Sequence, residues 1–349
     1  GNLFMEDPLH YHKAHEPRPN WESEIELPIQ QNDLILSYGE RCSAMVISRA
    51  IEMYVGRQSC VFDSIWVRGV HGNAKIVEIS MNPTLLKNNI VVVPGFYGYD
   101  KNTKIIKTIG ESGSDITASA IGSLIDAKEI IIYTDVKGIF NADPRKVTDA
   151  KIIKTIHPKD VIELGYAGGS VLHPRTILMI LDLPIKLWVR HLFGEEEEGT
   201  LVTVNDNSPC LAVALKDDQI LVTVETQHIA GIPGIASKLF SQLAMDGISV
   251  SLITQSCSEC SISFTINEKF ISSLDKINNI IELKKVGIVT LVGSNMRSQV
   301  GIATAFFQSL SKNNINVIAI SQGSTERSLS AVVSRENSLE SLRCVHSII

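Results

Sequence analysis

The second half of the chain carries the same pattern twice. Residues 234–263 and 301–330 align without a gap, so that GIASKLFSQLAMDGISVSLITQSCSECSIS lies over GIATAFFQSLSKNNINVIAISQGSTERSLS. Each copy predicts a helix followed by two strands, and a further strand precedes each helix, at 219–225 and 286–293. A unit of this kind leaves one apolar face open, so we expect the two copies to pair side by side.

The first half alternates strands with helices. A helix over 39–56 is predicted by apolar residues that recur on one face, such as Ala44, Ile47 and Val55, and by Gly56, which would end it. The other predicted elements are a helix over 116–125 and strands over 33–37, 60–67, 89–96 and 129–136. Alternation of this type favours a parallel sheet with helices on both faces.

The composition is typical of a globular protein that acts on small molecules. The chain has 349 residues, 44% of them hydrophobic, and a net charge of −6 from 32 basic and 38 acidic side chains. This balance gives no reason to expect nucleic acid or an anionic membrane as a partner. No apolar run reaches the roughly 18 residues that span a bilayer, and the N-terminal region lacks the order of a signal peptide. We therefore expect a cytoplasmic protein.

The cysteines and histidines do not form a recognisable metal motif. The six cysteines are scattered along the chain, which favours reduced thiols over a disulfide framework. Cys257 and Cys260 have C-x-x-C spacing but lack a second pair or a nearby histidine. His10, His12 and His15 lie on a polar segment and are expected to be solvated. We predict no metal held by protein ligands alone.

Three loops that follow predicted strands are candidates for a ligand site, namely 37–41, 94–98 together with 110–115, and 134–147. Ligands of open α/β sheets bind outside the carboxyl ends of the strands. In GESGSD at 110–115, glycines allow close approach to the backbone, and the helix that follows offers N–H groups to an anion. The same loop carries Glu111, whose charge opposes an anionic ligand.

Longer motifs indicate a family. GESGSDITASAIGSLIDAKEIIIYTDVKGIFNADPRKV, followed by ELGYAGGSVLHPRT, resembles the aspartate kinases, which have the amino-acid kinase fold. LITQSCSECSISF and IAISQGSTERSLSAVV resemble the paired ACT modules that regulate these enzymes, especially in the aspartokinase part of bifunctional aspartokinase–homoserine dehydrogenases. The resemblance runs from about Leu34 to Val333, and no G-x-G-x-x-G dinucleotide motif follows the second module.

The resemblance implies an α/β fold class, with an amino-acid-kinase-like, mainly parallel sheet covered by helices on both faces and a duplicated ACT (β-α-β-β) regulatory domain. We divide the chain into an irregular N-terminal segment at 1–33, an incomplete amino-acid kinase-like domain at 34–205, a first ACT domain at 211–280 and a second at 284–349. ACT sheets pair across subunits, so the expected assembly is a homodimer formed through the ACT domains.

The activity implied by the resemblance is transfer of the γ-phosphate of ATP to the side-chain carboxylate of L-aspartate, a reaction that depends on positioning and charge neutralisation. Glu40 and Asp115 would be the catalytic residues and would face the ammonium group of the substrate. Phe96 would form a wall of the substrate pocket, Ser114 would donate to the substrate carboxylate, and Gly113 belongs to the same loop.

By the same resemblance, the residues at the nucleotide would be Thr134, Asp135, Phe140, Arg145 and Ser170. Arg145 suits phosphate or adenine-side contacts, because its charge persists at any working pH. Mg²⁺ is expected with ATP, bridging phosphates and held by few protein ligands. A structural interpretation remains open, since Asp143 to Arg145 could also form an ordinary turn.

Three departures from the family pattern remove positive charge. The usual K-F-G-G loop is missing from residues 1–33, Glu111 replaces the arginine of the substrate loop, and Ser170 replaces a frequent lysine. Two like charges ~4 Å apart repel by about 4 kcal/mol at an effective dielectric constant near 20. Glu111 therefore opposes the carboxylate of aspartate unless it turns outward or is protonated. Lys137 is near the nucleotide loop but is expected to be solvated.

Two functional classes therefore remain open. The first is an aspartokinase, including one with an altered substrate, and the second is a catalytically impaired kinase-like protein that regulates a partner. In both, an amino-acid effector such as threonine or lysine would bind at equivalent points of the repeat, at Gln255 with Ser256 and Gln322 with Gly323. An amide offers a donor and an acceptor, which suits a zwitterion, although these glutamines could instead satisfy the backbone at a sheet edge.

Overall fold

The computed structural model describes residues 29–81, 90–169, 172–194, 198–204, 211–225, 234–255, 261–277, 280–294, 296, 299–323 and 327–349. The chain divides into two compact units, residues 1–113 and 114–349, and each is described by itself. Most of the irregular segment predicted at 1–33 lies outside the described residues, and residues 29–33 are helical rather than irregular. None of the helices described has the length and hydropathy needed to cross a membrane.

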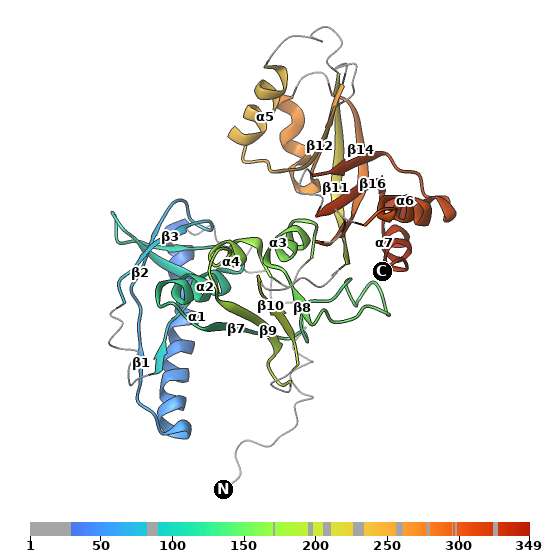
Figure 1. Ribbon diagram of the computed structural model, residues 1–349. Helices are drawn as coiled ribbons and strands as arrows, with labels where there is room; N and C mark the ends of the chain where they lie inside the picture. Colours follow the sequence, from blue (N-terminus) through green and yellow to red (C-terminus); the bar gives the residue numbers. More distant parts are fainter. Residues whose placement is uncertain are drawn as a thin grey trace, which may run out of the picture. The chain divides into compact units, whose positions relative to one another are not determined.

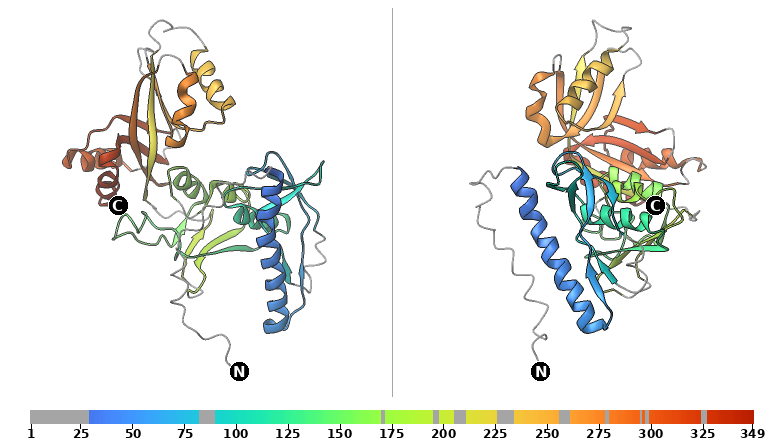
Figure 2. Two further views of the ribbon diagram at one scale, coloured as in Figure 1. Left: turned by 180° about the vertical axis from the view of Figure 1, so that it is seen from behind. Right: turned by 90° about the vertical axis from the view of Figure 1, so that its left-hand side faces the viewer.

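The first unit begins with the long helix α1 (Ile29–Ala50), shown in blue in Figure 2, which continues as a π-helical turn (Ile51–Val55). The strand predicted over 33–37 is therefore wrong, and the predicted helix starts earlier. A short apolar run does not distinguish a strand from a helix. The predicted apolar face is also wrong, because Ala44 is buried whereas Ile47 is 49% exposed. Polar side chains occupy most of the buried face instead, namely Asp33, Ser37 and Ser48.

The strands of the first unit are short. Strand β1 (Ser59–Val61) pairs in parallel with β4 (Ile90–Val92), and a four-stranded sheet has the order β3 (Lys75–Ile79), β2 (Ile65–Arg68), β5 (Tyr97–Asp100) and β6 (Ile106–Thr108). The strand predicted over 60–67 thus divides in two. The strand predicted over 89–96 ends at Val92, and Phe96 has a left-handed φ of 75° where the chain bends before β5.

The second unit begins with α2 (Gly113–Leu124), which corresponds to the helix predicted over 116–125. Its first sheet has the order β7 (Glu129–Thr134), β9 (Lys186–His191), β10 (Thr200–Val202) and β8 (Thr155–Ile156). The pairs β7–β9 and β10–β8 are parallel and β9–β10 is antiparallel, so the sheet is mixed. Ile130 and Ile132 of β7 are buried in the core, as the apolar run predicted.

Two helices of this unit begin with the same His-Pro sequence. Helices α3 (Pro158–Tyr166) and α4 (Pro174–Leu178) each have proline in the first helical position, where its fixed φ is favourable and no N–H is needed. The preceding histidines, His157 and His173, accept a backbone N–H two residues later through Nδ1, at 3.1 Å in both cases. The sequence His-Pro therefore fixes where each helix starts.

The duplicated region forms one six-stranded antiparallel sheet, of which β11, β12, β14 and β16 are labelled in Figure 1. The first copy contains β11 (Ala212–Glu225), α5 (Ile235–Met245), β12 (Val250–Gln255) and β13 (Ser261–Asn267). The second contains β14 (Ile280–Val292), α6 (Ile302–Lys312), β15 (Ala319–Gln322) and β16 (Ser328–Ser334), and α7 (Ser338–His346) follows. The copies join through β11 and β14, which confirms the predicted side-by-side pairing and the α/β fold class.

An ion pair connects α3 to the duplicated sheet within the second unit. Helix α3 packs against β11 and β14. Arg327, next to β16, lies 2.6 Å from Asp160 of α3, and Asp160 is only 1% exposed. Ser328 Oγ donates to Glu163 Oε2 of the same helix at 2.9 Å. Because a carboxylate removed from water needs a counter-charge, Arg327 stabilises the position of α3.

We predict that Arg327→Met destabilises the protein by about 3 kcal/mol, since it leaves the buried Asp160 without its partner. Urea unfolding followed by circular dichroism measures the change. Arg335→Met is the matched control, because Arg335 pairs with Glu268 at the surface and its loss should have a much smaller effect. Equal losses in the two variants would contradict the role of the buried pair.

Candidate active site

The glycine loop at 110–113 packs closely against its neighbours in the first unit. Gly110 has a φ of +95°, and a Cβ atom there would lie 2.2 Å from the carbonyl oxygen of Gly72. The N–H of Gly113 donates to the carbonyl of Gly110 at 3.0 Å, and a Cβ atom on Gly113 would lie 3.0 Å from Cα of Phe96. The structure thus brings Phe96 and Gly113 together, and the short distance and positive φ at Gly110 require glycine there, whereas a Cβ atom on Gly113 would make a tight contact.

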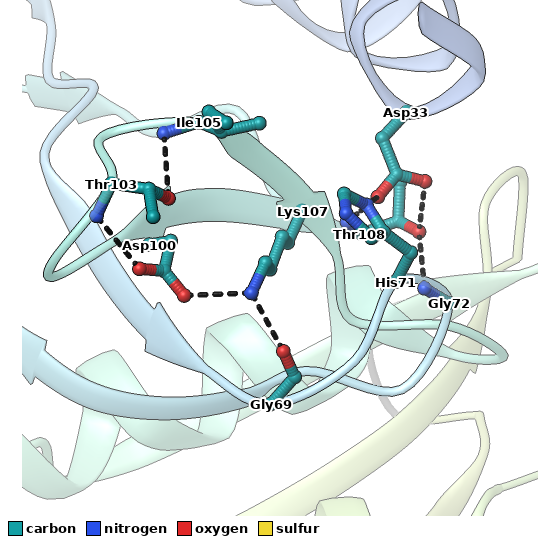
Figure 3. Close-up of polar contacts among 9 residues, drawn as sticks. All are labelled: Asp33, Gly69, His71, Gly72, Asp100, Thr103, Ile105, Lys107 and Thr108. Atoms are coloured by element: carbon teal, nitrogen blue, oxygen red, sulfur yellow. Dashed lines mark hydrogen bonds and ion pairs between the residues drawn. The ribbon is translucent and has the colours of Figure 1, made fainter. Parts of the chain in front are cut away.

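A buried polar network holds the strand that leads into this loop (Figure 3). Asp33 of α1 accepts the backbone N–H of Thr108 at 3.0 Å and its hydroxyl at 2.9 Å. The Thr108 hydroxyl accepts the N–H of Gly72 at 3.1 Å, and His71 Nδ1 is paired with Asp33. Sequence reasoning missed this network, because Asp33 lay in an apolar run that was interpreted as a strand.

A second network in Figure 3 fixes the neighbouring residue of the same strand. Lys107 Nζ lies 2.7 Å from Asp100 Oδ2 and donates to the carbonyl of Gly69 at 2.7 Å. The Lys107 ammonium, together with backbone N–H donors, holds the pKa of the Asp100 carboxyl well below its ordinary range. Adjacent residues of β6 are therefore fixed by charged partners before the chain enters the glycine loop.

The two acidic residues predicted near the substrate in this unit are not buried. Glu40 is partly exposed on α1, which corrects the prediction that residues 37–41 form a loop after a strand. Glu111 is exposed at the surface of the glycine loop. At the dielectric constant of water, two like charges ~4 Å apart repel by only about 1 kcal/mol. Because Glu111 is exposed, its repulsion of a substrate carboxylate is expected to be near this smaller value.

The first turn of α2 carries Ser114 and Asp115. Ser114 is exposed, whereas Asp115 is partly buried. Burial raises the pKa of the Asp115 carboxyl above its ordinary value. A partly desolvated carboxylate is poised to bind a cation, and the positive end of the helix dipole is suited to an anion. The turn thus offers both kinds of contact.

The second unit contains a cavity of about 490 Å³ that begins at the end of β7. Four of the five residues predicted to hold a nucleotide line it, namely Thr134, Asp135, Phe140 and Arg145. The fifth, Ser170, lies outside the described residues. Gly168 and Gly169, which precede it, line the cavity. A Cβ atom on Gly168, where φ is +106°, would lie 2.8 Å from the carbonyl oxygen of Leu215.

A buried threonine anchors the loop that forms this cavity. Thr200 of β10 has no exposed surface, and its hydroxyl accepts the N–H of Ile139 at 2.8 Å and donates to the carbonyl of Ile153 at 2.7 Å. Gly138 allows this approach, since a Cβ atom there would lie 2.7 Å from the same hydroxyl. The loop motif was evident in the sequence, but an anchor about sixty residues away was not.

Arg145 and Lys146 supply the positive charge at the cavity. Arg145 makes two side-chain hydrogen bonds to Asp143, at 3.0 and 3.1 Å, and Lys146 Nζ lies 3.0 Å from Asp217. Burial alone would raise the pKa of Asp143, but the hydrogen bonds from Arg145 outweigh it and the pKa lies below its ordinary value. Lys137 is exposed and does not line the cavity, as its solvated interpretation predicted.

The oxygen donors at this cavity are suited to a hard cation. Thr134 Oγ1 donates to Asp135 Oδ1 at 3.0 Å, and Asp143 is also present. Within the described part of the chain, no group of three His, Cys, Asp or Glu side chains is arranged to hold a metal ion. Carboxylate and hydroxyl oxygens fit Mg²⁺ that is carried by phosphates rather than by a protein cage.

The predicted effector residues occupy equivalent positions in the duplicated sheet. Gln255 ends β12 and Gln322 ends β15, and both side chains are exposed. Ser256 lies outside the described residues. Gly323 is exposed directly after β15.

Comparisons with known proteins agree along most of the chain. A family model for the amino acid kinase family matches residues 4–191, and one for the ACT domain matches residues 222–272 and 289–348. The chloroplastic bifunctional aspartokinase/homoserine dehydrogenase 2 of Arabidopsis thaliana is 33% identical over 290 residues, 77% of this chain and 31% of that protein. The chain thus spans about a third of the length of this relative. Aspartokinase of Bacillus sp. strain MGA3 is 32% identical over 349 residues, 91% of this chain and 82% of that protein.

Solved structures show the same likeness. The crystal structure of Escherichia coli aspartokinase III in complex with aspartate and ADP superimposes with a TM-score of 0.81 at 26% identity, covering 93% of this chain and 77% of that one. The same enzyme in complex with lysine and aspartate gives a TM-score of 0.71 at 26% identity, covering 94% and 77% of the two chains.

We predict that Thr200→Val loosens the loop at 134–147. The variant leaves the N–H of Ile139 without its acceptor, which costs about 1–3 kcal/mol. Hydrogen–deuterium exchange should become faster in this loop and remain unchanged in the duplicated sheet. Thr223→Val is the matched control, because Thr223 bonds Ser263 at 3.0 Å across β11 and β13, away from the loop. Unchanged exchange at the loop in Thr200→Val would contradict the anchor.

Proposed function

The chain belongs to the amino acid kinase family, as an aspartokinase with ACT domains, and from this premise we propose that it transfers the γ-phosphate of ATP to the side-chain carboxylate of L-aspartate. One observation carries the proposal. Four residues chosen from motif order, Thr134, Asp135, Phe140 and Arg145, line one cavity of about 490 Å³. A cavity of this size suits a nucleotide, and two cations at its edge suit phosphates.

The chain's own residues would act through position and charge. Arg145 and Lys146 would neutralise phosphate oxygens, and Gly168 and Gly169 would let phosphates approach the backbone. In the first turn of α2, the helix start would bind the α-carboxylate of aspartate and Asp115 its ammonium group. The side-chain carboxylate would then be left free to attack the phosphorus.

Mg²⁺ that enters with ATP would supply positive charge that offsets the negative charge of the phosphates. Asp135 and Thr134 are the residues we assign to orient the ion or its water ligands, because their oxygens lie together at the cavity. The likeness to a structure in complex with ADP supports nucleotide binding by this chain.

We keep the remaining sequence predictions as part of the proposal. The domains are placed at 34–205, 211–280 and 284–349, and the assembly is a homodimer through the ACT domains. Threonine or lysine would bind at Gln255 and Gln322, and the lysine complex of a structural relative supports an amino-acid effector. A cytoplasmic location also remains part of the proposal.

The alternative is a catalytically impaired, kinase-like regulatory protein, and Glu111 is the observation that favours it. Formation of aspartyl hydroxamate by the purified chain, dependent on both ATP and L-aspartate, distinguishes the two. Turnover by the wild type is expected. Turnover that appears only in Glu111→Arg would favour the impaired protein, and no turnover in either would contradict the kinase.

We predict that Glu111 weakens aspartate binding without controlling turnover. Because Glu111 is exposed, Glu111→Gln should lower KM for L-aspartate by about fivefold, which corresponds to about 1 kcal/mol, and Glu111→Arg should lower it further. The gain should shrink at high salt. Initial rates at two ionic strengths measure the change in KM, and Glu129→Arg, at the exposed start of β7, is the control. An unchanged KM would place Glu111 outside the field of the substrate.

We predict opposite effects of Asp115→Asn on activity and stability. Removing the carboxylate should reduce kcat/KM for aspartate by about tenfold or more, because a charge-assisted contact is lost. The pKa of the Asp115 carboxyl is raised in the folded state, so above that pKa the charged carboxylate destabilises the folded protein relative to the unfolded chain. At low pH the carboxyl is protonated in both states, and this destabilisation is absent. The variant should therefore have a higher Tm at neutral pH.

The pH dependence of kcat/KM tests the role of the same carboxylate. In the wild type, kcat/KM for aspartate should rise as pH increases through the raised pKa of Asp115, and the rise should disappear in Asp115→Asn. Asp126→Asn is the control, because Asp126 is exposed and its φ of 50° is tolerated by asparagine. A lower Tm together with normal kinetics in Asp115→Asn would make Asp115 a structural residue.

A further inference from the structure

A second cavity, of about 230 Å³, lies in the second unit between α3 and the duplicated sheet. Half of its lining residues carry a hydroxyl group, namely Tyr166, Ser251, Thr290, Ser321, Ser328 and Ser330. Drug-sized ligands occupy pockets of roughly 300–1,000 Å³, so this one suits a smaller molecule. Its lining is too polar for a gap in a hydrophobic core, since hydroxyls from β12, β14, β15 and β16 converge on it.

The cation of this cavity is Lys216, on β11. Its Nζ atom lies 3.1 Å from Ser251 Oγ, and the ion pairs formed among the described residues do not include it. Burial lowers the pKa of the Lys216 ammonium, against the opposing field of Asp218. A partly desolvated ammonium bonded to a neutral hydroxyl is better satisfied by an anion.

An opposite charge lines the same cavity. Glu163 of α3 contributes its carboxylate, which accepts the hydroxyl of Ser328 at 2.9 Å. A purely anionic ligand would be repelled by Glu163, and a purely cationic one by Lys216. A small molecule with both charges satisfies the two side chains at once, and the hydroxyls can donate or accept around it.

We propose that this cavity binds a small zwitterionic α-amino acid, with its carboxylate at Lys216 and its ammonium group at Glu163. The site differs from the effector positions at Gln255 and Gln322, which do not line the cavity. Ser321 and Gly323 line it, so the strand presents these two residues to the cavity and Gln322, between them, to the opposite side. The proposal goes beyond phosphotransfer and does not require it.

The site shares structural elements with the larger cavity. Residues Val161, Leu164 and Gly165 of α3 line the 490 Å³ cavity, whereas Glu163, Tyr166 and Ala167 line the smaller one. On β11, Leu215 borders the first and Lys216 the second. An amino acid held between α3 and the sheet therefore contacts an element that shapes the nucleotide cavity. Binding in the two cavities should be coupled, and the coupling should be reciprocal.

Isothermal titration calorimetry on the full chain tests the site with glycine, L-alanine and L-serine as probes, because none of these is the ligand proposed for Gln255 and Gln322. Acetate and ethylammonium, each carrying one of the two charges, are titrated alongside. At least one amino acid should bind more tightly than either half-ligand. Lys216→Met and Glu163→Gln should each weaken its binding by about tenfold or more, as expected for the loss of a charged contact.

Two further variants assign the binding to this cavity. Lys312→Met, the same substitution at an exposed lysine at the end of α6, and Gln255→Ala should both leave Kd unchanged. The proposal is overturned if none of the three amino acids binds, if acetate binds as tightly, or if Lys216→Met and Glu163→Gln retain the wild-type Kd. Binding that is lost in Gln255→Ala but kept in Lys216→Met would likewise assign it elsewhere.

ADP titrations with and without the bound amino acid test the coupling. The Kd for ADP should change when the amino acid is present, and the change should be absent in Lys216→Met. An unchanged Kd in the wild type would overturn the coupling. Hydroxamate formation by the unliganded wild type is a separate readout, so failure of the amino-acid site and failure of the proposed phosphotransfer give different results.

Discussion

The position of α3 depends on a carboxylate that has almost no access to water. Asp160 is 1% exposed, and Arg327 of the duplicated region is its partner at 2.6 Å. An unpaired charge at this depth would cost several kcal/mol, so the helix is stable in this place only while the sheet supplies the guanidinium. Because α3 lines both cavities of the second unit, one ion pair connects the regulatory fold to the walls of the proposed nucleotide site.

The sequence predicted those features whose determinants lie close together along the chain. The duplication, its side-by-side pairing and the loop at 134–147 all follow from contiguous motifs, and the structure places four motif residues around one cavity. The prediction failed at α1, where a five-residue apolar run was assigned to a strand. The buried face of that helix is largely polar, with Asp33 bonded to Thr108, and hydrophobic periodicity does not reveal a polar face.

Partners that are distant in sequence explain most of what was missed. Thr200 anchors Ile139, Arg327 pairs with Asp160, and Asp33 fixes the strand before the glycine loop. Thr200, Asp160 and Asp33 lie outside the quoted motifs, and each acts through a partner in a distant segment of the chain. The charge of Glu111 was evident in the sequence, but its effect depends on exposure, which only the fold determines.

The two copies of the repeat also show how one of two equivalent hydroxyl pairs comes to line a cavity. Thr223 bonds Ser263 at 3.0 Å, and the equivalent pair Thr290 and Ser330 has a distance of 2.9 Å, so the scaffold is the same in both. Helix α3 packs against β11 and β14. Residues of α3 line the smaller cavity together with Lys216 of β11 and with Thr290 and Ser330. Duplication therefore supplied the hydroxyls twice, and contact with the kinase region enclosed one set with a cation and an anion.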